Sequence, residues 1–231
     1  MKSYTVHLIR HGTCEGNLEG KYIGRTESPL ADKGMMEIIE LKKECGYPQV
    51  EAHYASPSTR CVDTLKIIYP EADPEVILEM AECDFGDFEN RDIEELRRDP
   101  VFNEWINNGQ KTPPPNGESS FVFMQRVCKG FEMMVNNMLF SGTKSAALVT
   151  HGGVIMTILA AYGIPKAKMT DWMCAPGSGY SIRITPNLWS RSRVVEVFDT
   201  VPLNKSEDDI DEELINLARD AADVLFPDSE D

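Results

Sequence analysis

Two short apolar segments constrain the fold of this chain most, because each ends in a turn in which a histidine precedes a glycine. Residues 4–9 lead into Arg10-His11-Gly12, and residues 145–150 lead into His151-Gly152-Gly153. Segments of this length and character are typical of strands buried on both faces of a parallel sheet. The carboxyl ends of such strands meet at one edge of the sheet, where ligands bind. We therefore expect the two turns to contribute to one pocket.

The segments between these strands have helical spacing, so strands and helices alternate along the chain. This alternation predicts an α/β fold, a three-layer α/β/α sandwich with a mostly parallel central sheet and helices on both faces. We expect strands at 4–9, 53–55, 76–78 and 145–150, and an antiparallel hairpin of 181–185 and 194–199 across a loop at 186–193. We expect helices at 31–45 and 59–69, one or two helices within 91–110 broken near Pro100, and a helix that ends near Tyr162. A further long helix is expected to carry a core stripe of Phe121, Met124, Cys128, Phe131, Val135 and Met138.

The charge of the chain excludes two classes of partner. The 231 residues include 23 Lys and Arg against 38 Asp and Glu, a net charge of −15. Such a surface repels phosphate backbones and anionic lipid, so we expect neither nucleic acid nor a membrane as partner. No stretch approaches the ~20 apolar residues of a membrane span, and the first residues lack the layout of a signal peptide, which favours a cytoplasmic protein. An anionic substrate would need a local basic pocket.

The length suits one substantial domain, which we assign to residues 1–204. Residues 205–231 hold 11 acidic and 2 basic side chains, with an apolar stripe at helical spacing from Ile210 to Leu225. We expect an acidic helix and tail that pack on the same domain. Docking of a partner or of a second subunit, as in a dimer, is the alternative. The six cysteines lack zinc-type spacing, so we expect no structural zinc site.

The basic pocket is expected where three strands end. Arg10 follows the first strand, and Arg60 follows the short strand at 53–55. Each guanidinium supplies a planar fork of N–H donors that suits phosphate oxygens. Glycine after each histidine lets the backbone approach a ligand closely. We therefore place the pocket among Arg10, His11, Arg60 and His151.

With these motifs, the chain resembles the histidine phosphatase superfamily, in its phosphoglycerate mutase-like branch. The resemblance spans residues 4 to about 162, keeps the family order of motifs, and implies the phosphoglycerate mutase-like version of the sandwich. The family motifs stand here as Arg10-His11-Gly12 with Asn17, Gly24 with Leu30 and Gly34, Ser56-Pro57 with Arg60 and Thr64, Glu82 with Gly86 and Glu89, Gly117-Glu118-Ser119, and His151-Gly152-Gly153.

The resemblance implies a metal-independent phosphomonoesterase that needs no cofactor and acts on a small phosphorylated metabolite. His11 would be the nucleophile that forms a phosphohistidine. Glu82 would protonate the leaving group and then deprotonate water, for which its pKa must lie above ~4.3. The implied catalytic residues are His11, Glu82, Arg10, Arg60 and His151, and the implied substrate-binding residues are Asn17, Gly24, Thr26 and Gly152.

Three functions stay open at this point. Mutases of the family carry a long insertion between the general-acid glutamate and the Gly-Glu-Ser segment. Here the stretch from Glu82 to Gly117 is short, which favours hydrolysis because water reaches the phosphohistidine. The stretch Glu82–Glu89 also resembles the α-ribazole phosphatase group. The alternatives are a phosphoglycerate-type mutase and a non-catalytic module that binds a phosphorylated ligand or a partner.

Some other side chains have two interpretations, and some are expected to be structural. Trp105, Trp172 and Tyr180 would either line the leaving-group side of the pocket or belong to the core. Cys14 lies in the loop after His11, where a pKa lowered by Arg10 would make its thiol sensitive to oxidation. His7 and His53 lie within strands and match no motif, so we expect them to be structural. Glu118 is either a ligand or an acid at the start of a helix.

Overall fold

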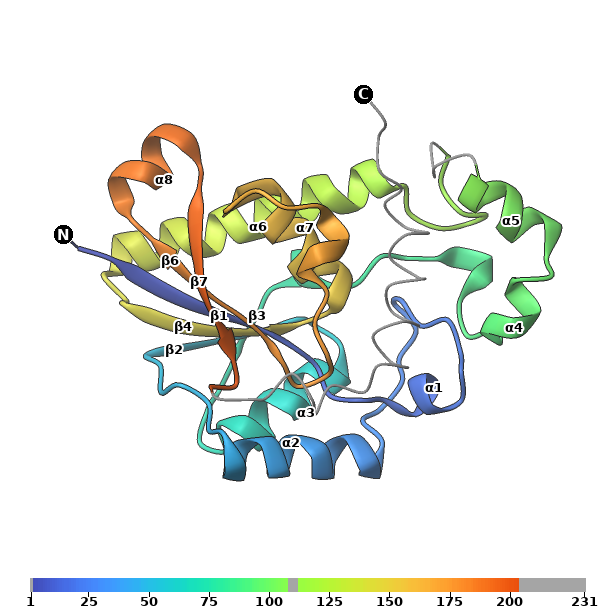
Figure 1. Cartoon of the computed structure of the whole chain (residues 1–231), viewed down its shortest axis with the longest axis horizontal. Coiled ribbons are helices and arrows are strands. Elements are labelled where there is room, and N and C mark those ends of the chain that lie inside the picture. Colours follow the sequence, from blue (N-terminus) through green and yellow to red (C-terminus); the bar gives the residue numbers. More distant parts are fainter. Residues whose placement is uncertain (1, 108–111, 204–231) are drawn as a thin grey trace.

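The described part of the chain is built around one central β-sheet (Figure 1). The computed structural model describes residues 2–107 and 112–203. Within them the sheet order is β3-β2-β4-β1-β6-β7-β5. Strands β3, β2, β4 and β1 run parallel, whereas β6 is antiparallel to its neighbours β1 and β7. The strands are β1 (Tyr4–Arg10), β2 (Ala52–Ala55), β3 (Glu75–Val76), β4 (Ser145–Thr150), β5 (Gly163–Ile164), β6 (Gly179–Ile184) and β7 (Val195–Val201).

Helices cover both faces of the sheet, which confirms the predicted three-layer sandwich. Helices α2 and α3 lie on one face, and α6 and α7 lie on the other (Figure 1). The predicted helix at 31–45 is observed as α2, and Gly46, with φ of +75°, follows its end in the left-handed region that glycine favours. The helices are α1 (Glu15–Leu18), α2 (Asp32–Glu44), α3 (Thr59–Ile68), α4 (Ile93–Leu96), α5 (Pro100–Asn107), α6 (Ser120–Ser141), α7 (Gly152–Tyr162) and α8 (Pro186–Ser192), with 3-10 turns η1 (Leu78–Met80), η2 (Gly86–Phe88) and η3 (Met169–Trp172).

Alternate residues of the central strands fill two separate cores. Leu8 of β1 and Leu148 of β4 belong to the core beneath α6 and α7. Ile9 and Val149, one position along, belong to the core beneath α2 and α3. Because side chains alternate across a strand, a strand that is apolar at consecutive positions is buried on both faces. The apolar runs in the sequence therefore mark β1 and β4 as the middle of the sheet.

The stripe predicted for the long helix is partly wrong. In α6, Phe121 is 71% exposed and Met124 is 41% exposed, and the helix buries Phe123 and Val127 in their place. The predicted and observed stripes share Phe131, Val135 and Met138, which are buried as expected. Apolar residues lie on either side of this shared stripe, so periodicity alone does not fix the rotation of the helix. The other buried residues of α6 are Gly130 and Met134.

Two further local predictions change in the structure. The antiparallel hairpin of β6 and β7 is confirmed, but its connection is the helix α8 rather than a loop. Pro186 begins this helix at a position where a missing N–H costs nothing. Arg193 ends it with φ of +49°. The third strand covers Glu75–Val76, because Leu78 already starts the turn η1.

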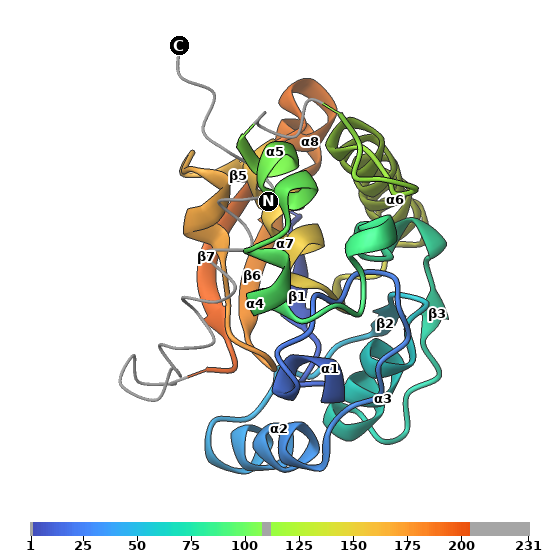
Figure 2. The same cartoon turned by 90° about the vertical axis from the view of Figure 1, so that its right-hand side faces the viewer.

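One end of the sheet carries the irregular part of the chain. The short helices α1, α4 and α5 gather at the carboxyl end of β1, and Figure 2 looks onto this end. The predicted break near Pro100 is confirmed, since α4 ends at Leu96 and α5 begins at Pro100. The predicted acidic helix at 205–231 lies outside the described residues. Among the helices of the described part, none has the length and apolar character needed to cross a membrane.

Candidate active site

The two histidine-glycine turns meet, as the strand pattern predicts. β1 and β4 are parallel neighbours, with Arg10 paired to Thr150 at their carboxyl ends. The next residues, His11 and His151, are both buried, and their ring centroids lie 5.1 Å apart in an edge-to-face arrangement. The backbone N–H of His11 donates to the Thr150 carbonyl at 2.9 Å, which locks the two turns together. The two histidines therefore lie in one cluster at this end of the sheet.

The His11 ring is held as a neutral imidazole. Its Nδ1 lies 2.7 Å from the Gly12 carbonyl, which assigns the proton to Nδ1 and leaves the lone pair on Nε2. Burial, followed by the charges of Arg60 and Arg10, holds the pKa of His11 well below its ordinary 6.5. An uncharged, unprotonated Nε2 is the form that a nitrogen nucleophile requires.

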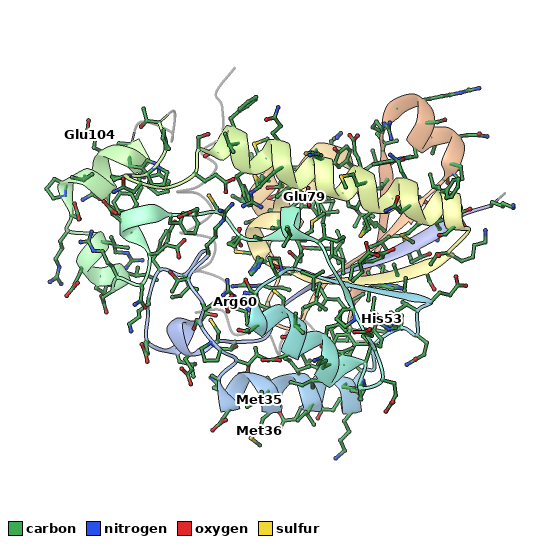
Figure 3. The ribbon with its side chains drawn as sticks, turned by 180° about the vertical axis from the view of Figure 1, so that it is seen from behind. Met35, Met36, His53, Arg60, Glu79 and Glu104 are labelled. Carbon is green, nitrogen blue, oxygen red and sulfur yellow. The ribbon has the colours of Figure 1, made fainter. Side chains whose placement is uncertain are left out.

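Arg60 is fixed at the centre of the site. It lies in the first turn of α3, is 1% exposed, and points toward the sheet end (Figure 3). Its Nη1 donates to the Thr26 carbonyl at 3.0 Å and its Nη2 donates to the Gly24 carbonyl at 2.6 Å. Its Nε lies 3.3 Å from His11 Nε2, and its Nη2 lies 3.3 Å from His151 Nδ1. One guanidinium thus touches both histidines.

His151 is oriented from its far side by a serine. Its Nε2 lies 2.7 Å from Ser56 Oγ, in the turn after β2, so its Nδ1 faces Arg60. Burial and the charge of Arg60 hold the pKa of His151 well below 6.5. The ring is therefore neutral near pH 7, and the positive charge of this cluster comes from arginine.

Arg10 is the second arginine of the cluster. Its Nη1 donates to the Cys174 carbonyl at 2.8 Å. Its buried Nε has no hydrogen-bond partner within residues 2–107 and 112–203. Because a buried donor is costly to leave unpaired, an unsatisfied N–H of this kind indicates a place for an acceptor such as a phosphoryl oxygen.

Glu82 is a buried carboxyl group against the start of α7. Its Oε1 accepts from Cys83 N–H at 3.0 Å, and its Oε2 accepts from Gly153 N–H at 3.1 Å. Burial raises the pKa of Glu82, although the two backbone donors and the charges of Arg60 and Arg126 oppose that rise. The carboxyl group approaches Gly153 so closely that a Cβ there would meet Glu82 Oε1 at 2.5 Å. A side chain at position 153 would therefore displace the carboxyl group of Glu82.

The predicted substrate-binding residues serve partly as supports. The carbonyls of Gly24 and Thr26 hold Arg60, and the Thr26 N–H and hydroxyl both donate to Glu89. Asn17 Oδ1 accepts from Cys14 N–H at 3.2 Å, which leaves the Asn17 amide N–H groups as its donors to a ligand. Gly152 lies beside the Arg10 side chain, where a Cβ would be 3.6 Å from Arg10 Nε. The structure thus brings all nine predicted site residues to the same end of the sheet.

Sequence reasoning missed one pair beside this site. Arg126, from the second turn of α6, forms two hydrogen bonds of 2.7 Å with Glu118 and one of 2.8 Å with the Glu82 carbonyl. Glu118 is therefore an ion-pair partner that precedes the capping residue Ser119, rather than an acid within the helix. Helical spacing treats Arg126 as a surface residue, so the only signal for this pair was the Gly-Glu-Ser motif itself.

The side chains with open interpretations lie outside this cluster. His7 bonds Ser181 at 2.9 Å, and His53 packs against Tyr69 away from Arg60 (Figure 3). Trp105 and Trp172 are buried members of the core. Tyr180, whose ring contacts Trp172, is half-buried and donates to the Met173 carbonyl.

Cys14 does not contact Arg10 through any described hydrogen bond, and its buried thiol donates to Asn17 Oδ1 at 2.9 Å. A fully buried thiol is poorly accessible to oxidants, so the structure gives no support to a redox role for Cys14.

Within the described ranges, no group of three or more His, Cys, Asp or Glu side chains is arranged to hold a metal ion.

Comparisons with known proteins point to one family. The family described as the histidine phosphatase superfamily (branch 1) matches residues 6–197. The adenosylcobalamin/alpha-ribazole phosphatase of Salmonella typhimurium is 27% identical over 205 residues, which are 86% of this chain and 95% of that protein. A putative phosphoserine phosphatase 2 of Hydrogenobacter thermophilus is 28% identical over 67% of this chain and 76% of its own length.

Solved structures agree with this assignment. A putative alpha-ribazole-5'-P phosphatase from Escherichia coli superposes with a TM-score of 0.70 at 25% identity, over 87% of this chain and 96% of that chain. A phosphoglycerate mutase from Bacillus anthracis superposes with a TM-score of 0.70 at 16% identity, over 94% of this chain and 96% of its own. This second likeness concerns the fold alone.

Proposed function

Because the chain belongs to the histidine phosphatase superfamily, we propose that it is a phosphomonoesterase that hydrolyses a small phosphorylated metabolite through a phosphohistidine on His11. One observation carries this proposal. His11 has Nδ1 tied to the Gly12 carbonyl and Nε2 directed at Arg60. A neutral imidazole beside a fixed guanidinium suits attack on a phosphorus atom whose oxygens bind the same cation.

In the first step, the lone pair of His11 Nε2 attacks phosphorus. The bond from phosphorus to the ester oxygen breaks, and its electron pair stays on that oxygen. The protonated carboxyl group of Glu82 transfers its proton to this oxygen, so the leaving group departs as an alcohol. The raised pKa of Glu82 favours the protonated form at the start of this step.

In the second step, the Glu82 carboxylate takes a proton from water. The water oxygen attacks the phosphohistidine, the bond from phosphorus to nitrogen breaks, and its electron pair returns to Nε2. Inorganic phosphate leaves, and both His11 and Glu82 are restored to their starting forms. Charge in a loose phosphoryl-transfer transition state spreads over the equatorial oxygens. In the proposed mechanism Arg10 and Arg60 stabilise that charge, and Arg60 exchanges His11 Nε2 for a phosphoryl oxygen as the reaction begins.

Hydrolysis fits the chain better than isomerisation. The segment between Glu82 and Gly117 forms only η2, α4 and α5 in its described residues. The Salmonella alpha-ribazole phosphatase aligns over 86% of this chain, whereas a phosphoglycerate mutase from Rhizobium etli that is 29% identical aligns over 72% of it. A mutase must keep water away from its phosphoenzyme, and a shorter enclosing segment does so less well.

The natural substrate is proposed as a phosphate ester of a small alcohol. Two phosphatases similar to this chain are named for phosphorylated α-ribazole and for phosphoserine, which are both esters of alkyl alcohols. Alkoxides leave poorly without a proton. A buried general acid such as Glu82 therefore contributes most to this class of substrate.

A direct test is hydrolysis of p-nitrophenyl phosphate from about pH 5 to 8 in the presence of EDTA, with His11→Ala as control. Activity that survives chelation and disappears in the variant supports a metal-independent route through His11. Activity that EDTA abolishes contradicts metal independence, and activity retained by His11→Ala contradicts the nucleophile. The mutase alternative predicts phosphate exchange between the hydroxyl groups of a phosphoglycerate in place of release.

We also propose a cytoplasmic location. The six cysteines are all free thiols, which suits a reducing compartment. The acidic segment 205–231 stays a prediction. Deleting it and measuring the mass of the protein in solution separates packing on its own domain from assembly of a second subunit.

A further inference from the structure

Arg126 uses every donor of its guanidinium on one short segment of chain and one carboxylate. Its Nε and Nη2 donate to the two oxygens of Glu118 at 2.7 Å each. Its Nη1 donates to the carbonyls of Glu79 at 2.8 Å and Ala81 at 2.7 Å. The second N–H of Nη2 donates to the Glu82 carbonyl at 2.8 Å. An arginine has five such donors, so none remains for solvent.

The pair is only slightly exposed to water. The side chain of Arg126 is 17% exposed and that of Glu118 is 8% exposed. A two-point pair between guanidinium and carboxylate has a fixed plane, so Glu118 determines where the remaining three N–H groups point. Lysine cannot reproduce this geometry, because an ammonium group binds as a point charge.

Arg126 binds the backbone of residues 79–82, and this segment ends in Glu82, the proposed general acid. Residues 79–82 run from η1 into extended chain and belong to no strand of the described sheet. The Glu82 carboxyl group is bonded to its neighbour Cys83 and to Gly153. Three hydrogen bonds from the Arg126 guanidinium to backbone carbonyls therefore fix the backbone that carries the Glu82 side chain.

We propose that Arg126, oriented by Glu118, is a positioning residue for the general acid Glu82. This inference rests on the proposed function. It deepens that function, because it identifies what holds the acid against the start of α7. The charge of Arg126 also reaches the acid, since it opposes the rise of the Glu82 pKa that burial causes.

A purely structural role would be different in one measurable respect. If Arg126 only joined α6 to η1, its loss would lower the activity toward every substrate by the same factor. If it positions the acid, its loss matters most where the leaving oxygen needs a proton. Nitrophenolate leaves without much help, whereas an alkoxide does not.

The experiment compares kcat/KM for p-nitrophenyl phosphate and for glycerol 2-phosphate in Arg126→Lys, Glu82→Gln and the unchanged chain. The ratio kcat/KM covers the steps up to the departure of the leaving group. We expect Arg126→Lys to lower kcat/KM by about 30- to 100-fold for the alkyl ester and by less than about fivefold for the aryl ester, on the scale of a misplaced general acid. Glu82→Gln sets the upper limit of this leaving-group effect.

Met138→Ala is the matched control for stability. Met138 is a buried residue of the same helix α6 and lies toward the opposite end of that helix from Arg126. Its truncation leaves a cavity and lowers the melting temperature, but it removes none of the bonds to the segment at 79–82. We expect its ratio of aryl to alkyl activity to equal that of the unchanged chain. Glu118→Gln, which keeps the shape of the pair but removes its charge, serves as the second variant if Arg126→Lys does not fold.

The outcomes separate this inference from the proposed function. A steep leaving-group effect in both Glu82→Gln and Arg126→Lys supports the inference. A steep effect in Glu82→Gln with equal losses on both esters in Arg126→Lys and Glu118→Gln overturns the inference and leaves the proposed function intact. An unchanged ratio in Glu82→Gln overturns the assignment of the general acid, and the inference with it.

Discussion

Replacing Gly153 by alanine tests whether the observed position of Glu82 is the position that the reaction needs. A Cβ at residue 153 would lie 2.5 Å from Glu82 Oε1. Ordinary contact begins at 3.4 Å, so the carboxyl group must retreat by about 0.9 Å. A displacement of about 1 Å in a reacting group costs on the order of 100-fold in rate. We therefore expect Gly153→Ala to lower kcat/KM for an alkyl phosphate by roughly 100-fold.

Gly152→Ala provides the comparison within the same helix turn. Its Cβ would be 3.6 Å from Arg10 Nε, which is an ordinary contact. Both glycines begin α7, where alanine is at least as favourable as glycine, so neither variant is expected to lose much stability from helix propensity. We expect Gly152→Ala, whose added methyl group lies beside Arg10 rather than Glu82, to change the ratio of alkyl to aryl activity far less than Gly153→Ala does.

The assay is steady-state hydrolysis by both variants, with thermal melting to show that each is folded. A folded Gly153→Ala protein that keeps kcat/KM within about threefold of the unchanged chain would show that the reaction does not need Glu82 in its observed position. In that case the carboxyl group either acts from another position or does not act as the general acid.

Three more predictions follow from burial. Because the His11 and His151 pKa values lie well below 6.5 in the folded protein, the unfolded chain binds more protons below that pH, so the free energy of unfolding falls as pH falls. His11→Asn should reduce this slope by up to about 1.4 kcal/mol per pH unit in urea titrations between about pH 7 and 5.5, and an unchanged slope would contradict the neutral imidazole. Tyr22→Phe removes a buried hydroxyl that has no partner in the described part of the chain, so the free energy of unfolding should stay the same or rise by about 1 kcal/mol, whereas a loss of more than about 1 kcal/mol would reveal a partner. Burial raises the pKa of Cys61 to about 12 and also raises that of Cys83, so iodoacetamide at about pH 7.5 should leave the activity intact, and rapid inactivation would show that these thiols are exposed.

The sequence predicts this site well where function depends on the ends of strands. Arg10 and His151 follow apolar strands that are parallel neighbours, so strand topology alone brings their turns together. Arg60 is found by the same logic, because its helix follows β2. The order of motifs then gives Glu82, which no periodicity would single out.

What the sequence does not predict depends on packing between distant segments. Arg126 meets the carbonyls of residues 79–82 only because α6 crosses η1, and no local pattern encodes that crossing. The rotation of α6 is similar, since Phe121 and Phe123 are equally apolar and the surrounding layers decide which is buried. The short helix α8 required recognising Pro186 as a helix start rather than as part of a loop.

The proposed mechanism depends on transfer of the phosphoryl group to His11. The most direct measurement uses Glu82→Gln, in which the second step lacks its base, so the phosphoenzyme should accumulate. The variant is mixed with p-nitrophenyl phosphate, quenched in alkali, where phosphohistidine survives, and digested for mass spectrometry. The phosphohistidine mechanism predicts one phosphoryl group on the peptide that contains His11. This group should be lost on acid treatment and absent from the double variant with His11→Ala. Turnover with no phosphoryl group on this peptide, or with the group on another residue, would contradict a phosphohistidine on His11.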